Sequence, residues 1–139
     1  MPAGGARKPA SEETVKASEH YIQMEGREVF RHAVRRMEGA VKSCLDQANL
    51  REEDISYLVP HQANIRIIEA LAKRFNVPND RVYLTIHKYG NTSASSVGIA
   101  FDELLREKKI ENGEHIVLCA FGSGLTWGAV TLTCEETVK

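Results

Sequence analysis

The stretch DISYLVPHQANIRIIEALAKRF, Asp54–Phe75, combines the two kinds of secondary structure that decide the fold. Residues 54–59 form a short apolar run that predicts a β-strand. From Asn64 to Phe75, apolar residues recur at steps of three and four, which predicts an amphipathic helix. The segment Pro60–Asn64, which carries the polar side chains of His61, Gln62 and Asn64, lies between the two elements. A strand that leads directly into a helix favours an α/β domain.

The flanking sequence continues this alternation of helices and strands. Apolar residues spaced three and four apart predict a long helix from Arg27 to Ala48, and a helix that begins at Ser93 continues through Leu105. Gly122-Ser123-Gly124 predicts a hairpin between the last two strands. Strands are predicted at 20–25, 54–59, 81–86, 115–121 and 125–134. The expected fold is therefore α/β, with helices layered on a mixed five-stranded sheet.

The first residues differ in composition from the remainder. Residues 1–18 are rich in Gly, Ala, Ser, Pro and charge and have no sustained period. They predict an exposed segment in which a short helix begins at Ser11. We expect a connector at 1–19 and the α/β domain at 20–139, because such a beginning is more typical of the middle of a longer chain.

The overall composition is that of a soluble globular protein. With 139 residues, of which 42% are hydrophobic and 27% charged, the chain is long enough for one domain with a core. The formal net charge of −1 argues against a nucleic-acid-binding protein, which usually has a basic excess. No apolar run reaches the roughly 18 residues that would predict a membrane span.

The three cysteines, Cys44, Cys119 and Cys134, form no CxxC pair and have no metal-ligand spacing. An odd number without a disulfide framework indicates a reducing compartment. Cys119 lies in an apolar run and Cys44 on the apolar stripe of a predicted helix, so both are expected in the core. None of the three has the surroundings that activate a thiol, and none is predicted to be a catalytic nucleophile.

Polar residues follow three of the predicted strands, at His61, Asn91 and Ser123. Parallel strands of an α/β sheet place their following loops on one edge, where ligand sites form. A neutral imidazole and a carboxamide that meet there can donate two hydrogen bonds to one oxygen, as the stabilisation of an oxyanion or enolate requires. Gly122 and Gly124 allow the N–H between them to point into the same site.

Each of these residues also has an ordinary structural explanation. A single histidine is more often a structural residue than a catalytic one, and Asn91 after a glycine is typical of a turn or a helix N-cap. The Gly-Ser-Gly sequence alone predicts no more than a hairpin. The prediction of a site therefore depends on the three loops occurring together.

Three ordered segments give the chain a resemblance to a known family. His61-Gln62-Ala63-Asn64, Gly90–Ser96 and Ala120–Gly128 resemble β-ketoacyl-[acyl-carrier-protein] synthase III, a condensing enzyme of thiolase-type fold. The similarity extends through the chain but covers only the second of the family's two halves. The first half carries the nucleophilic cysteine, part of the acyl pocket and most of the dimer interface. The chain also departs from the family at Ser123, where many members have glycine.

The resemblance implies a role for each matching residue. His61 and Asn91 would bind the thioester carbonyl of malonyl-carrier protein and stabilise the enolate left by decarboxylation, with His61 as a neutral donor. The Ser123 N–H would complete the oxyanion hole for acyl transfer. Asn64 would orient the pantetheine arm. Arg66 would meet the phosphopantetheine or the acidic carrier protein, or would be a solvated charge on the helix face.

The activity that the resemblance implies is the decarboxylating Claisen condensation of an acyl-CoA starter with malonyl-carrier protein, the initiation of fatty-acid synthesis. It needs no metal and no redox cofactor. The partners would be acyl carrier protein, acyl-CoA, the missing N-terminal half and a second copy in a cytoplasmic homodimer, without nucleic acid or membrane. The chain alone is expected to be inactive because it lacks the nucleophile. The alternatives are a related ketosynthase-like acyltransferase of secondary metabolism and a non-catalytic half-domain that binds carrier protein.

Overall fold

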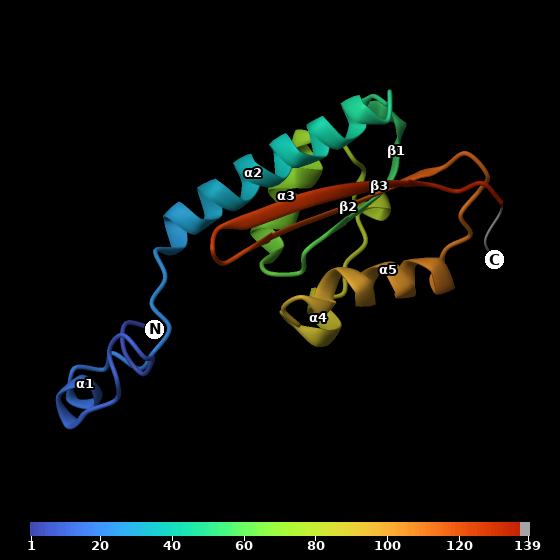
Figure 1. Cartoon of the computed structure of the whole chain (residues 1–139). Helices are drawn as coiled ribbons and strands as arrows, with labels where there is room; N and C mark the ends of the chain where they lie inside the picture. The colour runs from blue at the N-terminus through green and yellow to red at the C-terminus, as the bar shows by residue number, and fades with distance from the viewer. Residues whose placement is uncertain (137–139) are drawn as a thin grey trace. The chain divides into compact units, whose positions relative to one another are not determined.

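The central sheet has three strands in the computed structural model, which describes residues 1–136 (Figure 1). β1 (Ile55–Pro60) pairs in parallel with β2 (His115–Gly122), and β2 pairs antiparallel with β3 (Thr126–Thr133). The spatial order is therefore β1-β2-β3. These observations confirm the α/β class, the mixed sheet and the strands predicted at 54–59, 115–121 and 125–134.

Two of the five predicted strands are absent from the described part of the chain, so the prediction of a five-stranded sheet is wrong there. Residues 20–25 form no strand and have no strand partner, although their composition favours extended structure. The segment predicted as a strand at 81–86 makes a single parallel bridge, between Val82 and Leu58. It then turns into the short helix α4 (Ile86–Tyr89).

The side chain of Gln62 explains why the segment at 81–86 does not continue as a strand. Its amide oxygen accepts hydrogen bonds from the N–H groups of Thr85 and Ile86, at 2.9 and 3.1 Å. Its amide nitrogen donates to the carbonyl oxygens of Pro60 and Tyr83, at 2.7 and 3.3 Å. The buried glutamine thus satisfies the backbone groups that a neighbouring strand would otherwise pair. At this edge of the sheet, hydrogen bonds to the Gln62 side chain take the place of the backbone hydrogen bonds between two strands.

Three long helices confirm those predicted near 27–48, 64–75 and 93–105. The helices of the chain are α1 (Glu12–Lys16), α2 (Gly26–Gln47), α3 (Ile65–Arg74), α4 and α5 (Ser95–Glu107), with 3₁₀ turns at Glu52–Asp54 and Asn79–Arg81. Asn64 is the N-cap of α3, and its side-chain oxygen accepts from the Arg66 N–H at 2.9 Å. This N-cap fixes the point where the polar segment after β1 becomes helical.

The helices cover both faces of the sheet, with α2 and α3 on one side and α5 on the other (Figure 1). On the α2 side, the Cys44 sulfur lies 3.1 Å from the hydroxyl of Thr131 in β3. The opposite face packs against α5 through a cluster of buried residues: Val59, Tyr83, Ala100, Leu104, Ile110 and Ile116. The layered arrangement predicted from the alternating pattern is therefore present, and it leaves the ends of β1 and β2 between the helices.

The chain divides into two compact units, residues 1–30 and the part that begins at Arg31. In the first unit, Ser11 caps α1 by accepting from the Thr14 N–H at 3.3 Å, and the Thr14 hydroxyl accepts from the Ser11 N–H at 2.9 Å. The helix start predicted at Ser11 is confirmed. The boundary between a connector at 1–19 and a domain at 20–139 stays a prediction. None of the helices in residues 1–136 is long and apolar enough to cross a membrane.

We predict that Gln62→Ala strongly destabilises the domain. The side chain is fully buried, and its removal leaves the backbone groups it bonds without partners. Since each buried unsatisfied group costs about 1–3 kcal/mol, the free energy of unfolding should fall by about 3 kcal/mol or more. Urea denaturation measures the change.

The matched control for this variant is Gln47→Ala, because the Gln47 side chain is exposed and its hydrogen bond is to another exposed side chain, that of Ser43. Its effect should stay within about 0.5 kcal/mol. Equal unfolding midpoints for the two variants would show that the Gln62 amide does not hold the segment at 83–86.

Candidate active site

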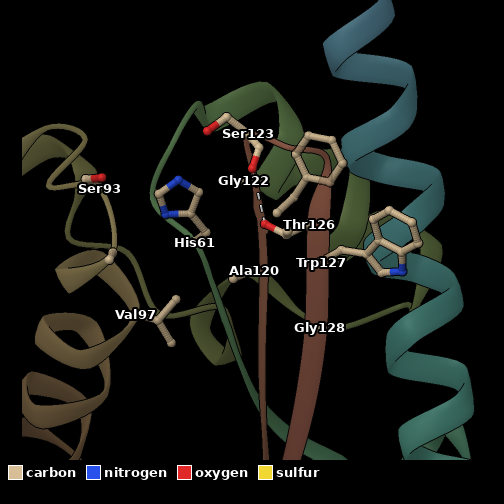
Figure 2. Close-up of a pocket in the computed structure, with 11 residues that line it drawn as sticks. His61, Ser93, Val97, Ala120, Gly122, Ser123, Thr126, Trp127 and Gly128 are labelled. Carbon is tan, nitrogen blue, oxygen red and sulfur yellow. Dashed lines mark hydrogen bonds between the residues drawn. The ribbon is translucent and has the colours of Figure 1, made fainter. Parts of the chain in front are cut away.

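A cavity of about 400 Å³ lies at the ends of β1 and β2 (Figure 2). His61, the first residue after β1, lies on one side of it. Ser93, Ala94 and Val97, at the start of α5, form a second side, and residues 120–123 and 126–128 of the β2–β3 hairpin form the third. Because β1 and β2 are parallel, both strands end at this edge of the sheet. The cavity therefore occupies the place where the sequence predicts a site.

The position of His61 is fixed from two directions. Its backbone N–H donates to the Cys119 carbonyl oxygen at 2.8 Å, which extends the parallel pairing one residue past the end of β1. Its ring nitrogen Nδ1 lies 2.5 Å from the Ser96 hydroxyl oxygen. Burial lowers the pKa of the His61 imidazole below its ordinary value. The ring is therefore mostly neutral at neutral pH.

Ser123 lies in the hairpin loop and lines the same cavity as His61. The loop lies opposite the imidazole, with Gly122 beside it (Figure 2). The Ser123 carbonyl oxygen accepts from the Thr126 hydroxyl at 3.4 Å, whereas its N–H donates no hydrogen bond within residues 1–136. The predicted hairpin is confirmed, and it leaves a backbone donor next to the cavity.

Asn91 is exposed and lies just outside the residues that line the cavity. Its side-chain oxygen accepts from the Ser93 N–H at 2.9 Å. Ser93 lines the cavity, whereas Asn91 does not. Of the two structural alternatives for Asn91, the turn is confirmed by this bond to the N–H two residues on, and the helix N-cap is wrong, since the N-cap of α5 is Ala94. With its oxygen held by Ser93, the free end of the carboxamide is the NH₂ group, which donates no hydrogen bond within the described residues.

Asn64 and Arg66 also lie outside the cavity lining, exposed at the start of α3. The side chain of Asn64 is used as the N-cap of the helix. The Arg66 guanidinium forms no ion pair with any residue in the described range, so both of its predicted interpretations stay open. The structure thus brings His61 and Ser123 to one cavity, and the other three predicted residues are not part of its lining.

No cysteine of the described residues lines the cavity. Cys119 is buried in β2, and burial raises the pKa of its thiol to about 12. The Cys44 sulfur contacts the Thr131 hydroxyl, and the Cys134 sulfur donates to the Glu136 carbonyl oxygen at 2.6 Å. Residues 1–136 also contain no group of three His, Cys, Asp or Glu side chains that could hold a metal ion.

Sequence reasoning gave no role to Gln62, Ser96 or Trp127, although all three lie in the segments that carry the resemblance. Gln62 and Ser96 are fully buried, which nothing in the residue types indicates. The Trp127 ring forms a cation–π contact with α2, where the Arg36 guanidinium carbon lies 4.5 Å from the ring centroid. Figure 2 shows this ring directed toward α2 and away from His61.

The fold of this chain is similar to that of thiolase-like synthases of known structure. The chain matches 3-oxoacyl-[acyl-carrier-protein] synthase III from Aquifex aeolicus with a TM-score of 0.77 and 50% identity, over 81% of this chain and 37% of that one. It also matches the priming β-ketosynthase of the R1128 polyketide pathway, with a TM-score of 0.76 and 33% identity over 91% of this chain and 40% of the other. These matches define the class as a thiolase-like α/β domain.

The chain belongs to the 3-oxoacyl-[acyl-carrier-protein] synthase III family, whose C-terminal family model matches residues 45–134. The β-ketoacyl-[acyl-carrier-protein] synthase III of Chlamydia muridarum is 62% identical over 132 residues, 95% of this chain and 40% of the relative. The synthase of the same name from Clostridioides difficile is 54% identical over 129 residues, 93% of this chain and 39% of the relative. The chain therefore spans about two fifths of the length of these relatives.

We predict that His61 makes the domain less stable as the pH falls. Its folded-state pKa is lowered by burial, whereas in the unfolded chain it is about 6.5. Below that pH the unfolded state binds the proton more readily, so stability is retained above the unfolded pKa and is lost as the pH falls toward the folded pKa. In His61→Gln the difference in unfolding free energy between about pH 7.5 and about pH 5.5 should be smaller than in the wild type.

Urea denaturation at the two pH values measures this difference, and the comparison between wild type and variant removes the contribution of all other groups. Equal pH dependence in the two proteins would contradict a lowered pKa for His61. A larger dependence in His61→Gln would mean that the protonated ring is stabilised in the folded state.

Proposed function

We propose that this chain is the C-terminal catalytic part of a β-ketoacyl-[acyl-carrier-protein] synthase III. The enzyme would condense an acyl-CoA starter with malonyl-carrier protein, losing carbon dioxide, at the start of fatty-acid synthesis. The observation that supports this most directly is that His61 and Ser123 line one cavity at the ends of parallel strands, where the His61 ring is neutral and the Ser123 N–H makes no hydrogen bond within residues 1–136. The names of the relatives agree with this activity.

In the first part of the reaction, the bond between the malonyl carboxylate and its α-carbon breaks, and the electron pair moves into an enolate of the thioester. The enolate oxygen would accept hydrogen bonds from the His61 Nε2–H and from the Asn91 NH₂ group. A neutral imidazole suits this role because it donates without a proton being gained or lost. Asn91 lies outside the cavity lining, but its oxygen is held by Ser93, which leaves the donor end of its amide available.

In the second part, the enolate carbon attacks an acyl group held as a thioester on a cysteine. This attack forms the new carbon–carbon bond and a tetrahedral oxyanion, which then collapses to a ketone as the carbon–sulfur bond breaks and the cysteine thiolate is released. The Ser123 N–H would donate to that oxyanion. This role requires only a backbone group and therefore tolerates serine at this position.

The cysteine nucleophile must come from outside the described residues of this chain. Cys119 is buried with a raised pKa, and neither Cys44 nor Cys134 lines the cavity. We infer that a further part of the enzyme, corresponding to the portion of the relatives that this chain does not match, supplies the thiol and closes the acyl pocket. The 139-residue chain alone would then be unable to carry out condensation.

We further propose that Asn64 and Arg66 bind the pantetheine arm and the carrier protein, since both lie exposed at the start of α3. A homodimer, action in the cytoplasm and chemistry without a metal or redox cofactor are predictions that rest on the family resemblance.

The rival functions differ in what they predict for the cavity. A ketosynthase-like acyltransferase of secondary metabolism has a structural relative in the R1128 priming enzyme, at 33% identity, whereas the synthase III relatives from Chlamydia muridarum and Clostridioides difficile are 62% and 54% identical. A half-domain that only binds carrier protein would not need a half-buried neutral histidine beside a backbone N–H that makes no hydrogen bond within residues 1–136. The closer relatives and the geometry both favour the condensing enzyme.

The test uses a chimaera in which the unmatched preceding part of the Chlamydia muridarum synthase is joined to this chain. His61→Ala and Asn91→Ala should each lower malonyl decarboxylation and condensation by about 10²–10³, the usual cost of losing one oxyanion donor. Acylation of the nucleophile by the starter acyl-CoA should largely persist, because that step depends on backbone N–H groups. Radiolabelled decarboxylation and mass spectrometry measure the two half-reactions.

His115→Ala is the control, because His115 lies at the beginning of β2, at the opposite end of the strand from the cavity. It should leave both half-reactions unchanged, and the unjoined chain should catalyse neither. Decarboxylation near the wild-type rate in His61→Ala would refute the proposed function. A parallel loss of both half-reactions together with a lowered melting temperature would mean that His61 is only structural.

A further inference from the structure

We propose that Ser96 is a positioning residue that selects the form of His61 with its proton on Nε2. A neutral imidazole carries one N–H, on either Nδ1 or Nε2, and only the Nε2 form can donate into the cavity while Nδ1 faces Ser96. This inference rests on the proposed function for its purpose, but its geometry is independent of the reaction.

Ser96 is the second residue of α5 and is fully buried. Its hydroxyl oxygen lies 2.5 Å from the His61 Nδ1 and accepts from the Gln62 N–H at 3.3 Å. The Gln62 N–H and the His61 Nδ1 therefore both contact the hydroxyl of Ser96, which belongs to α5. In Figure 2, one ring nitrogen of His61 faces α5 and the other points away from it, toward the open side between Ser93 and Ser123.

The number of hydrogens at this hydroxyl decides the direction of its bond to His61. The Gln62 N–H brings its own hydrogen, so it occupies a lone pair of the serine oxygen. The serine has a single hydrogen to donate, and within residues 1–136 the His61 Nδ1 is the one acceptor that it reaches. If Nδ1 carried the proton instead, the buried serine hydrogen would have no acceptor, which folded proteins rarely tolerate.

The consequence is that Nδ1 of His61 is an acceptor and Nε2 carries the hydrogen. The Nε2–H is then aimed at the side of the cavity where the proposed enolate oxygen would lie. Ser96 itself lies beneath the ring, is not among the residues that line the cavity and would not touch the substrate. Its effect would pass entirely through the orientation and proton position of His61.

Nitrogen-15 NMR of the chain labelled at histidine tests the proposal without any enzyme assay. In the wild type, the Nδ1 of His61 should have the shift of an unprotonated nitrogen and the Nε2 that of a protonated one. In Ser96→Ala, the ratio of the Nδ1–H form to the Nε2–H form should rise by about fivefold, the factor that one net hydrogen bond supplies. Assignment follows from the signals lost in His61→Gln.

Ser95→Ala is the matched control, because Ser95 is the exposed neighbour of Ser96 on the same helix and should leave the spectrum unchanged. A wild-type spectrum with the proton on Nδ1 would overturn the proposal, even if Ser96→Ala did not fold. An unchanged ratio in folded Ser96→Ala would overturn it as well.

The same variants in the chimaera separate this inference from the proposed function. Ser96→Ala should lower kcat for malonyl decarboxylation and leave KM nearly unchanged, and Ser95→Ala should do neither. If the NMR result holds but decarboxylation is unaffected, Ser96 still sets the ring form and the proposed function of His61 is wrong. If the spectrum shows no dependence on Ser96, the positioning role is wrong whatever the activity of the chimaera.

Discussion

The parallel pairing of β1 with β2 is the constraint on which the remaining structure depends. It continues past the end of β1 through the hydrogen bond from the His61 N–H to the Cys119 carbonyl oxygen, at 2.8 Å. Because both strands run the same way, the residues that follow them leave the sheet at the same edge. An antiparallel pairing would place His61 and the hairpin loop at opposite ends. The cavity, and every role proposed for it, follows from this one choice of strand direction.

Around this pairing, two buried polar side chains adjust the site. The Gln62 amide holds the segment at 83–86, which would otherwise add a strand, and so lets the chain turn into α4 and reach Asn91. The Ser96 hydroxyl joins the start of α5 to the imidazole of His61. Both side chains are fully buried, so the loss of either leaves unpaired groups in the interior. The positions of the site residues therefore depend on hydrogen bonds from these two buried side chains, which do not themselves line the cavity.

The sequence predicts the elements whose pattern is local. The strand at 54–59 and the amphipathic helix after it are visible in the spacing of their apolar residues, and so is the hairpin at 122–124. The segment at 81–86 has the same extended composition, but its structure is decided by Gln62, which is distant in the sequence, and no local pattern reveals such a partner.

The same distinction applies to the site. His61 and Ser123 could be placed at one edge from the ends of the strands, because strand direction is a property of the fold. Asn91 could not be placed in detail, since its side-chain orientation is set by its bond to the Ser93 N–H. Ser96 has no feature in the sequence that separates it from the serines beside it, and its importance follows from burial and from a contact across the fold.

The central claim is that His61 and Asn91 donate to one oxygen of the substrate. A crystal structure of the chimaera with a non-hydrolysable malonyl thioester analogue tests it most directly. Our account predicts that the thioester oxygen lies within about 2.7–3.2 Å of both the His61 Nε2 and the Asn91 amide nitrogen. A thioester oxygen that lies beyond hydrogen-bond distance of His61, or that is held only by groups other than these two, would contradict the account.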